Sequence, residues 1–212
     1  MAEGDIDFAV ITSPNNPTGK MASETFLKKL LDSSDALIMV DEAYFEFSRF
    51  SMRPYLDRYE NLVILRTFSK AFSLAGVRMG YLLANASVIR EFLKVRQPYS
   101  VDSVSQAIAT AVYRNRSLFV PGINQIIEQR GVLLEELGKL PGVTVFDSDS
   151  NYVLFRVADA GQVWQELYER GVLIRDFSRS QYLENCLRVS VGSPEENRVF
   201  LDALAEILNE RS

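Results

Sequence analysis

A lysine follows an apolar segment of the sequence and lies between hydroxyl and cationic side chains. Thr67 and Ser69 precede Lys70 by three and one residues. Arg78 follows it by eight residues. Hydroxyl groups and a guanidinium suit a phosphate ester, and an amine held against apolar walls can act on a carbonyl carbon. The run therefore indicates a reactive amine beside an anion pocket, although solvated loop charges at Lys70 and Arg78 stay an open alternative.

A carboxylate and a phenol follow a second apolar run. Asp41 comes directly after residues 37–40, which are all apolar and predict a short buried strand. A carboxylate at the edge of a buried sheet needs a cation or a hydrogen-bond donor, and the protonated ring nitrogen of a cofactor would serve. Tyr44 lies three residues later, where its phenol can point into the same cavity. The local sequence equally allows Asp41 to cap a helix that begins at Glu42.

Residues 13–20, SPNNPTGK, form a compact loop between a predicted strand and a predicted helix. This loop is not a phosphate-binding P-loop, because Pro14 stands where that motif needs glycine and Met21 where it needs Ser or Thr. Two prolines fix the backbone, so Asn16 can be presented rigidly to a site, although the loop taken alone favours a plain turn. The three polar segments together fit pyridoxal phosphate better than any other common cofactor.

The first half of the chain must position these residues. Short apolar runs alternate there with amphipathic segments, as in parallel βαβ units, and ligands of open parallel sheets bind beyond the carboxyl ends of the strands. Strands are expected at residues 6–12, 37–40, 62–65 and 79–84, and helices from about Ser23 and through 88–93. The first half is therefore predicted to be an α/β domain with its polar residues just past three strand ends.

The second half is predicted to be a smaller α+β domain. Helices through 104–111 and 123–137 form a bridge, and Ser193 with Glu196 forms a capping box that opens a C-terminal helix. Strands are expected at 143–146, 152–157, 172–175 and 187–191, with a helix at 163–169. The predicted organisation is a large domain over 1–98, bridging helices over 99–140 and a small domain over 141–212.

Composition excludes several kinds of chemistry. The 212 residues include 23 Lys+Arg, 28 Asp+Glu, no His and one Cys, which gives a net charge of −5. The negative charge disfavours nucleic acid as a partner. Without histidine, and with Cys186 alone, no His-based metal site, cysteine-rich zinc site, Ser-His-Asp triad or internal disulfide is possible. No segment reads as a membrane span or signal peptide, so no membrane partner and a cytoplasmic location are expected.

Three motifs carry a family resemblance. SPNNPTGK, VDEAYFEF and RTFSKAFSLAGVRMGYLLA resemble the core motifs of fold-type I, pyridoxal-phosphate-dependent aminotransferases, in the form typical of histidinol-phosphate aminotransferases. The resemblance runs over essentially all 212 residues. It implies an aspartate aminotransferase-like fold, with part of the large cofactor-binding domain followed by the small C-terminal α+β domain.

The resemblance also implies a role for each cofactor residue. Lys70 would be the Schiff-base lysine that carries a proton between the substrate Cα and the cofactor C4′. Asp41 would pair with the pyridine nitrogen. The remaining cofactor residues would contact its 3′-oxygen (Asn16 and Tyr44) or its phosphate (Thr67, Ser69 and Arg78).

Two arginines resemble the substrate-binding residues of the family. Arg188 would clamp an α-carboxylate, or the phosphate-bearing end of the amino donor, and Arg175 would be a second anion-binding arginine linked to the substrate phosphate. Asn16 would also face the substrate. Without the resemblance, both arginines would be interpreted as solvent-facing strand charges.

The implied reaction is a two-stage amino transfer. Glutamate would leave its amino group and depart as 2-oxoglutarate, and the second substrate would depart as histidinol phosphate. A homodimer is implied as well. Two alternatives stay open: an aminotransferase-fold fragment without activity of its own, or a related enzyme that acts on aromatic amino acids or on phosphothreonine.

The chain departs from the family at its beginning. Family members start well before the SPNNPTG loop, so the chain is expected to be truncated and to lack the first strands and helices of the large domain. Removing neighbours from a parallel sheet exposes apolar surface and unpaired backbone groups. We therefore expect self-association, strand exchange or poor stability, and a weaker affinity for pyridoxal phosphate than a complete enzyme has.

Overall fold

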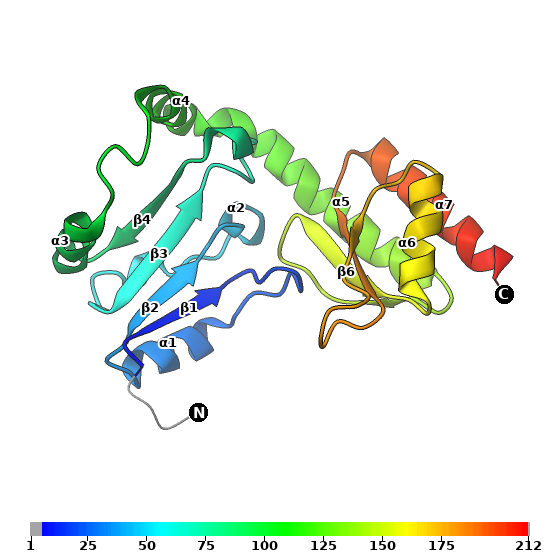
Figure 1. Ribbon diagram of the computed structural model, residues 1–212, viewed down its shortest axis with the longest axis horizontal. Helices are drawn as coiled ribbons and strands as arrows, with labels where there is room; N and C mark the ends of the chain where they lie inside the picture. The colour runs from blue at the N-terminus through cyan, green and yellow to red at the C-terminus, as the bar shows by residue number, and fades with distance from the viewer. Residues whose placement is uncertain (1–5, 212) are drawn as a thin grey trace. The chain divides into compact units, whose positions relative to one another are not determined.

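A computed structural model describes residues 6–211 and divides the chain into two compact units (Figure 1). The first unit holds the chain up to Asn15 together with Met21–Val120, and the second holds Asn16–Lys20 and the chain from Pro121 onward. This division falls inside the stretch for which bridging helices are predicted. The domain boundaries at 98/99 and 140/141 stay a prediction.

The first unit is built on a four-stranded sheet with the order β1-β2-β3-β4. Its strands are β1 (Phe8–Thr12), β2 (Leu37–Asp41), β3 (Leu62–Thr67) and β4 (Gly80–Ala84). The pairs β1–β2 and β2–β3 are parallel, as predicted, but β4 runs antiparallel to β3. The strand predicted at 79–84 is present, and its direction was not predicted: a parallel return needs a long crossover, usually a helix, and only a short 3-10 turn at Ala75–Val77 lies in this connection.

Helix α1 (Glu24–Asp32) covers one face of this sheet. The Ser23 hydroxyl accepts a hydrogen bond from the Phe26 amide, which confirms the predicted helix start. Leu27 and Leu31 of the helix pack with Ile38 and Val40 of β2 in one buried cluster. The other helical segments of this unit are α2 (Phe45–Ser48), α3 (Ala86–Val95), α4 (Ser103–Arg114) and the 3-10 turns Arg53–Tyr55 and Arg116–Phe119.

The second unit combines an antiparallel sheet with three helices. The sheet has the order β5-β6-β8-β7, and the helices are α5, α6 and α7. The strands are β5 (Thr144–Val145), β6 (Tyr152–Arg156), β7 (Arg175–Asp176) and β8 (Cys186–Ser190). The helices span Val120–Lys139, Ala160–Glu169 and Pro194–Glu210. The capping box between Ser193 and Glu196 is present as predicted.

One predicted strand of the second unit is wrong over most of its length. Val172, Leu173 and Ile174 lie outside β7, which begins at Arg175. The Val172 amide donates to the Leu167 carbonyl, and the Ile174 carbonyl accepts from the Trp164 indole. Both bonds go to residues of α6. They occupy the Val172 N–H and the Ile174 carbonyl, which a strand would use to pair with its neighbour.

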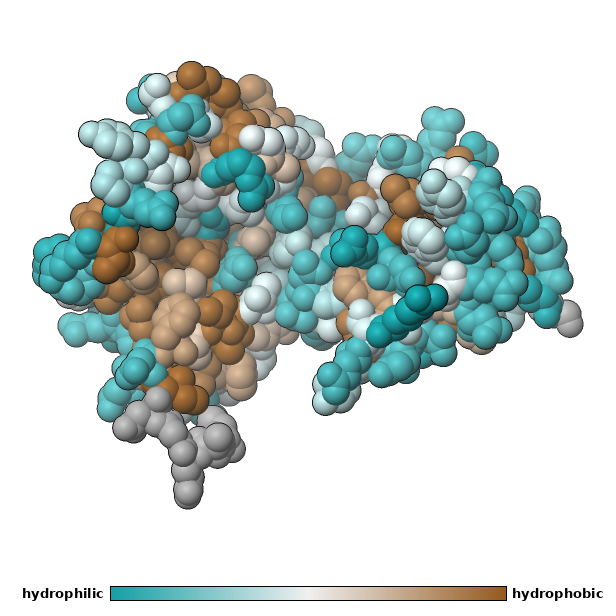
Figure 2. Space-filling view, viewed as in Figure 1, coloured by the Kyte–Doolittle hydropathy of each residue, from teal (hydrophilic) through white to brown (hydrophobic). Residues whose placement is uncertain are grey.

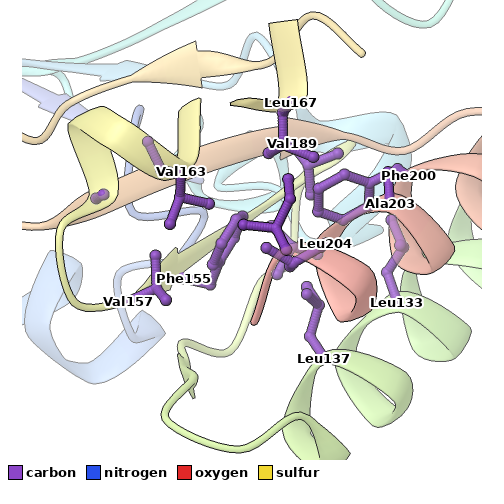
Figure 3. Close-up of a cluster of buried hydrophobic side chains, with 14 of the residues drawn as sticks. Leu133, Leu137, Phe155, Val157, Val163, Leu167, Val189, Phe200, Ala203 and Leu204 are labelled. Atoms are coloured by element: carbon purple, nitrogen blue, oxygen red, sulfur yellow. The ribbon is translucent and has the colours of Figure 1, made fainter. Parts of the chain in front are cut away.

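The core of the second unit lies between the helices and the strands β6 and β8. Figure 3 shows Phe155 of β6 surrounded by aliphatic side chains from α5, α6 and α7. Phe155 is completely buried, and its ring lies 5.9 Å from that of Phe200. Among residues 6–211, no helix is both long enough and apolar enough to cross a membrane.

Candidate active site

A pocket of about 580 Å³ opens in the first unit, where β2 and β3 end. Five of the residues predicted for the cofactor site line it together, namely Asp41, Thr67, Ser69, Lys70 and Arg78. These residues come from two separate sequence segments. The parallel pairing of β2 with β3 brings their carboxyl ends side by side, which is the placement that the strand pattern predicts.

Asp41 is the last residue of β2 and is half-buried. Its Oδ1 accepts a hydrogen bond from the Ala43 amide at 3.0 Å. Burial raises the pKa of Asp41, and the Ala43 N–H and the Lys70 charge partly offset that rise. Because α2 begins at Phe45, Asp41 turns the chain after the strand and does not cap a helix that starts at Glu42. A cation placed beside this carboxylate would therefore be stabilised by it.

Tyr44 lies just before α2 and is buried. The Lys70 Nζ lies 5.5 Å from the centre of its ring. Lys70 itself is exposed and lines the pocket, whereas Tyr44 is not among the residues that line it, so the role predicted for the Tyr44 phenol stays a prediction.

The turn after β3 holds the hydroxyl and cationic groups in place. Thr67 Oγ1 accepts from the Ser69 amide at 3.0 Å and donates to the Met79 carbonyl at 3.4 Å. Arg78 has a left-handed backbone with φ of 56°, and its Nη1 donates to the Ala75 carbonyl at 3.0 Å. A Cβ at Gly80 would lie 2.8 Å from a backbone oxygen of β3, so glycine lets the returning strand approach closely.

The second unit gathers the predicted substrate residues. Arg175 and Arg188 are directly opposite each other on β7 and β8, and both line a pocket of about 350 Å³. Arg188 Nη1 donates to Asn16 Oδ1 at 2.6 Å, and its guanidinium lies 4.6 Å from the centre of the Tyr152 ring. Within the described residues, Arg188 Nε is buried without a hydrogen-bond partner. Arg188 is thus held in place, whereas Arg175 is exposed.

The loop that carries Asn16 is anchored inside the second unit. The Asp149 amide donates to the Gly19 carbonyl at 2.8 Å, and Lys20 pairs with Asp147 at 3.0 Å. Gly19 has φ of +74°, and a Cβ there would collide with Ser148. The loop is therefore more than a plain turn, because Gly19 and Lys20 are bonded to the segment before β6 and Asn16 is bonded to Arg188 of β8.

Comparison with known sequences identifies the family. The sequence model described as aminotransferase class I and II matches residues 1–204. The chain belongs to the class I and II aminotransferases. This match confirms the family resemblance that the three motifs indicate.

Curated relatives of this aminotransferase chain share a substantial part of its sequence. It is 43% identical over 198 residues to the histidinol-phosphate aminotransferase of Thermoanaerobacter sp. (strain X514), with 93% of the chain and 56% of the relative covered. It is 40% identical over 203 residues to the histidinol-phosphate aminotransferase of Chlorobaculum tepidum, with 95% and 58% covered. The chain thus spans somewhat more than half the length of these relatives.

Solved structures confirm the predicted aminotransferase fold. The histidinol-phosphate aminotransferase of Clostridium acetobutylicum superposes with a TM-score of 0.89 at 24% identity, over 97% of the chain and 65% of that protein. The L-threonine-O-3-phosphate decarboxylase of Porphyromonas gingivalis gives 0.86 at 27% identity, over 96% and 65%. The Sinorhizobium meliloti histidinol-phosphate aminotransferase, solved with pyridoxal-5'-phosphate, gives 0.85 at 24%, over 97% and 58%. The fold is therefore shared by proteins named for different reactions.

The pocket of this aminotransferase chain matches the groups of pyridoxal phosphate. A half-buried carboxylate with a raised pKa suits a protonated ring nitrogen, an exposed amine suits the aldehyde, and two hydroxyls with a guanidinium suit the phosphate. All of them lie in one pocket of the first unit. The donor set therefore fits the cofactor that the family implies.

Sequence reasoning missed the charged residues beside this pocket. Glu42 is 2% exposed and forms an ion pair with Arg66, whose Nη2 lies 2.9 Å from Glu42 Oε2. Their positions gave a partial signal, because Glu42 directly follows Asp41 and Arg66 directly precedes Thr67, but these positions do not show that the two side chains meet. Side chains alternate across a sheet, so consecutive polar residues at a strand end point to opposite faces.

Proposed function

We propose that this chain carries the cofactor site and substrate arginines of a pyridoxal-phosphate-dependent aminotransferase that exchanges an amino group between histidinol phosphate and 2-oxoglutarate. The observation that carries the proposal is the pocket in which Asp41, Thr67, Ser69, Lys70 and Arg78 meet. The names and identities of the curated relatives support this choice of substrates.

Each residue of the first pocket has a task in this proposal. Asp41 binds the ring nitrogen and favours its protonated form, while the phenol O–H of Tyr44 donates a hydrogen bond to the 3′-oxygen. Thr67, Ser69 and Arg78 hold the phosphate through hydrogen bonds and charge. When bound, pyridoxal phosphate supplies the electron-withdrawing ring that makes the substrate Cα–H acidic. Lys70 Nζ takes this proton from Cα and returns a proton in each half of the reaction.

The second unit supplies recognition of the substrate anions. Arg188 binds a carboxylate or the phosphate end of the amino donor, because its guanidinium belongs to a residue that lines the pocket of about 350 Å³. Arg175, directly opposite on β7, binds a second anionic group. Asn16, bonded to Arg188, contacts both the cofactor and the substrate. Two adjacent guanidinium groups favour a doubly anionic substrate over a neutral one.

Association with a second copy and a cytoplasmic setting belong to the same proposal. Phe8 and Val10 of the edge strand β1 are 47% and 52% exposed, which supports burial of this strand against another chain. The one cysteine, Cys186, is a free buried thiol, which is compatible with a reducing compartment. Light scattering on the purified chain would measure the association directly, and a monomer at all concentrations would contradict it.

The test is a titration of the purified chain with pyridoxal phosphate. We expect a visible absorbance band, and borohydride reduction followed by peptide mass mapping should place the label on Lys70. Lys70→Ala should abolish the label, while Lys94→Ala, which removes an exposed lysine paired with Glu91 in the same unit, should leave it unchanged. Label on other lysines with equal yield in Lys70→Ala would contradict the assignment. No label in the wild-type chain would favour a fragment without activity of its own.

A second candidate reaction is supported by the similarity to the phosphothreonine decarboxylase structure. Histidinol phosphate, an aromatic amino acid and phosphothreonine should therefore be compared as substrates in parallel assays. If only histidinol phosphate gives a product, and only when 2-oxoglutarate is present, the proposed substrate is supported. Turnover of phosphothreonine with release of carbon dioxide would replace it.

A further inference from the structure

An ion pair is buried beside the cofactor pocket of the first unit, and one of its partners, Arg66, also lines that pocket. Glu42 Oε2 accepts from Arg66 Nε at 3.2 Å and from Arg66 Nη2 at 2.9 Å. Glu42 Oε1 accepts from the Met52 amide at 2.6 Å. The Ser51 hydroxyl donates to Glu42 and accepts from Arg66 at 2.7 Å, so it joins the two partners. Both charged side chains are nearly inaccessible to solvent, at 2% and 10% exposure.

The pair joins the two strand ends from which the cofactor residues project. Glu42 follows Asp41, and its amide donates to the Leu65 carbonyl at 2.9 Å, which extends the β2–β3 ladder by one step. Arg66 precedes Thr67 in β3. Alternation directs Glu42 and Arg66 to the face of the sheet that carries the buried cluster, and Asp41 and Thr67 to the other face. Glu42 and Arg66 therefore lie on the opposite face of the sheet from Asp41 and Thr67, and Arg66 reaches the edge of the pocket.

Both buried charged side chains have several polar or aromatic partners. Both Glu42 oxygens accept hydrogen bonds, and the Arg66 guanidinium lies 3.5 Å from the centre of the Phe45 ring. Buried ion pairs contribute little net stability compared with packed apolar side chains, because removing two charges from water is costly. What such a pair can provide is one defined geometry, since the bidentate contact fixes the guanidinium relative to the carboxylate.

We infer that Glu42 and Arg66 are positioning residues, which fix the separation between Asp41 and the Thr67–Lys70 turn so that one cofactor is bound at both its ring nitrogen and its phosphate. This inference rests on the proposed function. It also assigns the charges: Arg66 is neutralised by Glu42, which leaves Arg78 and Lys70 as the cations available to the cofactor. Both residues act through the two strand ends that they join.

Glu42→Gln is the variant that tests the inference most directly. The amide is isosteric, retains an oxygen for the Met52 amide and removes the charge that holds Arg66. We expect the dissociation constant for pyridoxal phosphate to rise about tenfold or more, with a smaller rise in Ser51→Ala. Arg58→Met is the matched control, because Arg58 pairs with Asp32 and stacks on Tyr59 in the same unit while remaining exposed. It should change the constant less than about twofold.

A merely structural role is separated from positioning by a stability-matched variant. Leu31→Ala removes a buried side chain of the same unit that does not line the pocket. If the loss of affinity only followed stability, Leu31→Ala would weaken binding as much as Glu42→Gln at equal free energy of unfolding. Equal weakening in the two variants would overturn the inference.

Amide hydrogen exchange without cofactor makes the test independent of the proposed function. Exchange of the Ala43, Phe68 and Ser69 amides, whose bonds shape the two strand ends, should be about tenfold or more faster in Glu42→Gln and unchanged in Arg58→Met. Unchanged exchange in Glu42→Gln would overturn the positioning role even if cofactor binding fell. If the wild-type chain binds no pyridoxal phosphate, the proposed function fails, and the exchange rates alone decide whether the pair positions the strand ends.

Discussion

The two units differ in how far their apolar side chains are covered. In the second unit, side chains from three helices and two strands form one large buried cluster around Phe155. In the first unit the buried cluster is smaller, every residue of β1 and α3 is at least partly exposed, and Phe8 and Val10 are about half-exposed. Figure 2 shows the same contrast, with hydrophobic atoms gathered over the unit that carries β1–β4 and hydrophilic atoms over most of the other.

This difference separates stability from chemistry. The second unit resembles a complete small domain, in which burial of apolar surface supplies the driving force for folding. The first unit has α1 on one face of its sheet, while the carboxyl ends of β2 and β3 open into the pocket. The residues with reactive groups thus lie on the unit with the less complete core. We therefore expect the two units to unfold in separate steps, with the first unit unfolding at lower denaturant.

The largest expected effect comes from emptying the core of the second unit. Phe155→Ala should lower its free energy of unfolding by about 3–5 kcal/mol, because the ring is completely buried among other apolar side chains. Val10→Ala in the first unit should cost less than about 0.5 kcal/mol in the monomeric chain, because that side chain is already 52% exposed. Urea unfolding followed by circular dichroism, at concentrations where light scattering detects only the monomer, measures both. A comparable loss in Val10→Ala under these conditions would break the comparison.

The sequence predicted the elements better than their directions. Apolar runs located the strands ending at Asp41 and Thr67, and the motif spacing located the residues that meet in the pocket. The direction of β4 was not predicted, because a pattern of apolar residues marks a strand but does not show which way it runs in the sheet. The expected strand at 172–175 failed for a tertiary reason, since α6 takes its backbone groups.

The charged residues beside the pocket were missed for a different physical reason. Nothing in local sequence shows that Glu42 meets Arg66, because the two lie 24 residues apart and become neighbours only when β2 pairs with β3. The same holds for Asn16, which is bonded to Arg188 across 172 residues. The family resemblance suggested roles for Asn16 and Arg188, whereas their mutual contact comes from the structure alone.

A medium effect is expected from the pH dependence of the first unit. Burial raises the pKa of Glu46 from its ordinary value of 4.5 to about 7, and Glu42 adds to the rise while Arg66 opposes it. Burial raises the pKa of Tyr81 in the same unit, and the negative charge of Glu46 adds to that rise. Between pH 4.5 and 7 the folded chain holds a proton that the unfolded chain releases, so stability from this group is complete below pH 4.5 and is lost as pH rises through 7.

Glu46→Gln should therefore stabilise the first unit at high pH. At pH 8 we expect the free energy of unfolding to rise by about 2 kcal/mol, which is less than the full pKa shift implies because solvent screens a partly exposed group. At pH 5 the rise should be about a quarter of that. Thermal unfolding at the two pH values measures the difference. Glu91→Gln, at an exposed glutamate of the same unit, is the control and should not alter the pH profile. An equal gain at pH 5 and pH 8 would contradict the protonation of Glu46.

The smallest expected effect comes from removing one N-terminal helix cap in each unit, which tests whether the two units unfold separately. Ser193→Ala removes the hydroxyl that accepts from the Glu196 amide at the start of α7, and Ser23→Ala removes the corresponding acceptor for Phe26 at the start of α1. Each should cost about 1 kcal/mol, with the larger loss in Ser193→Ala because its capping box is reciprocal. If the units unfold separately, Ser193→Ala shifts only the later urea transition and Ser23→Ala only the earlier one. A shift of both transitions by either variant would show that the two cores unfold as one cooperative structure.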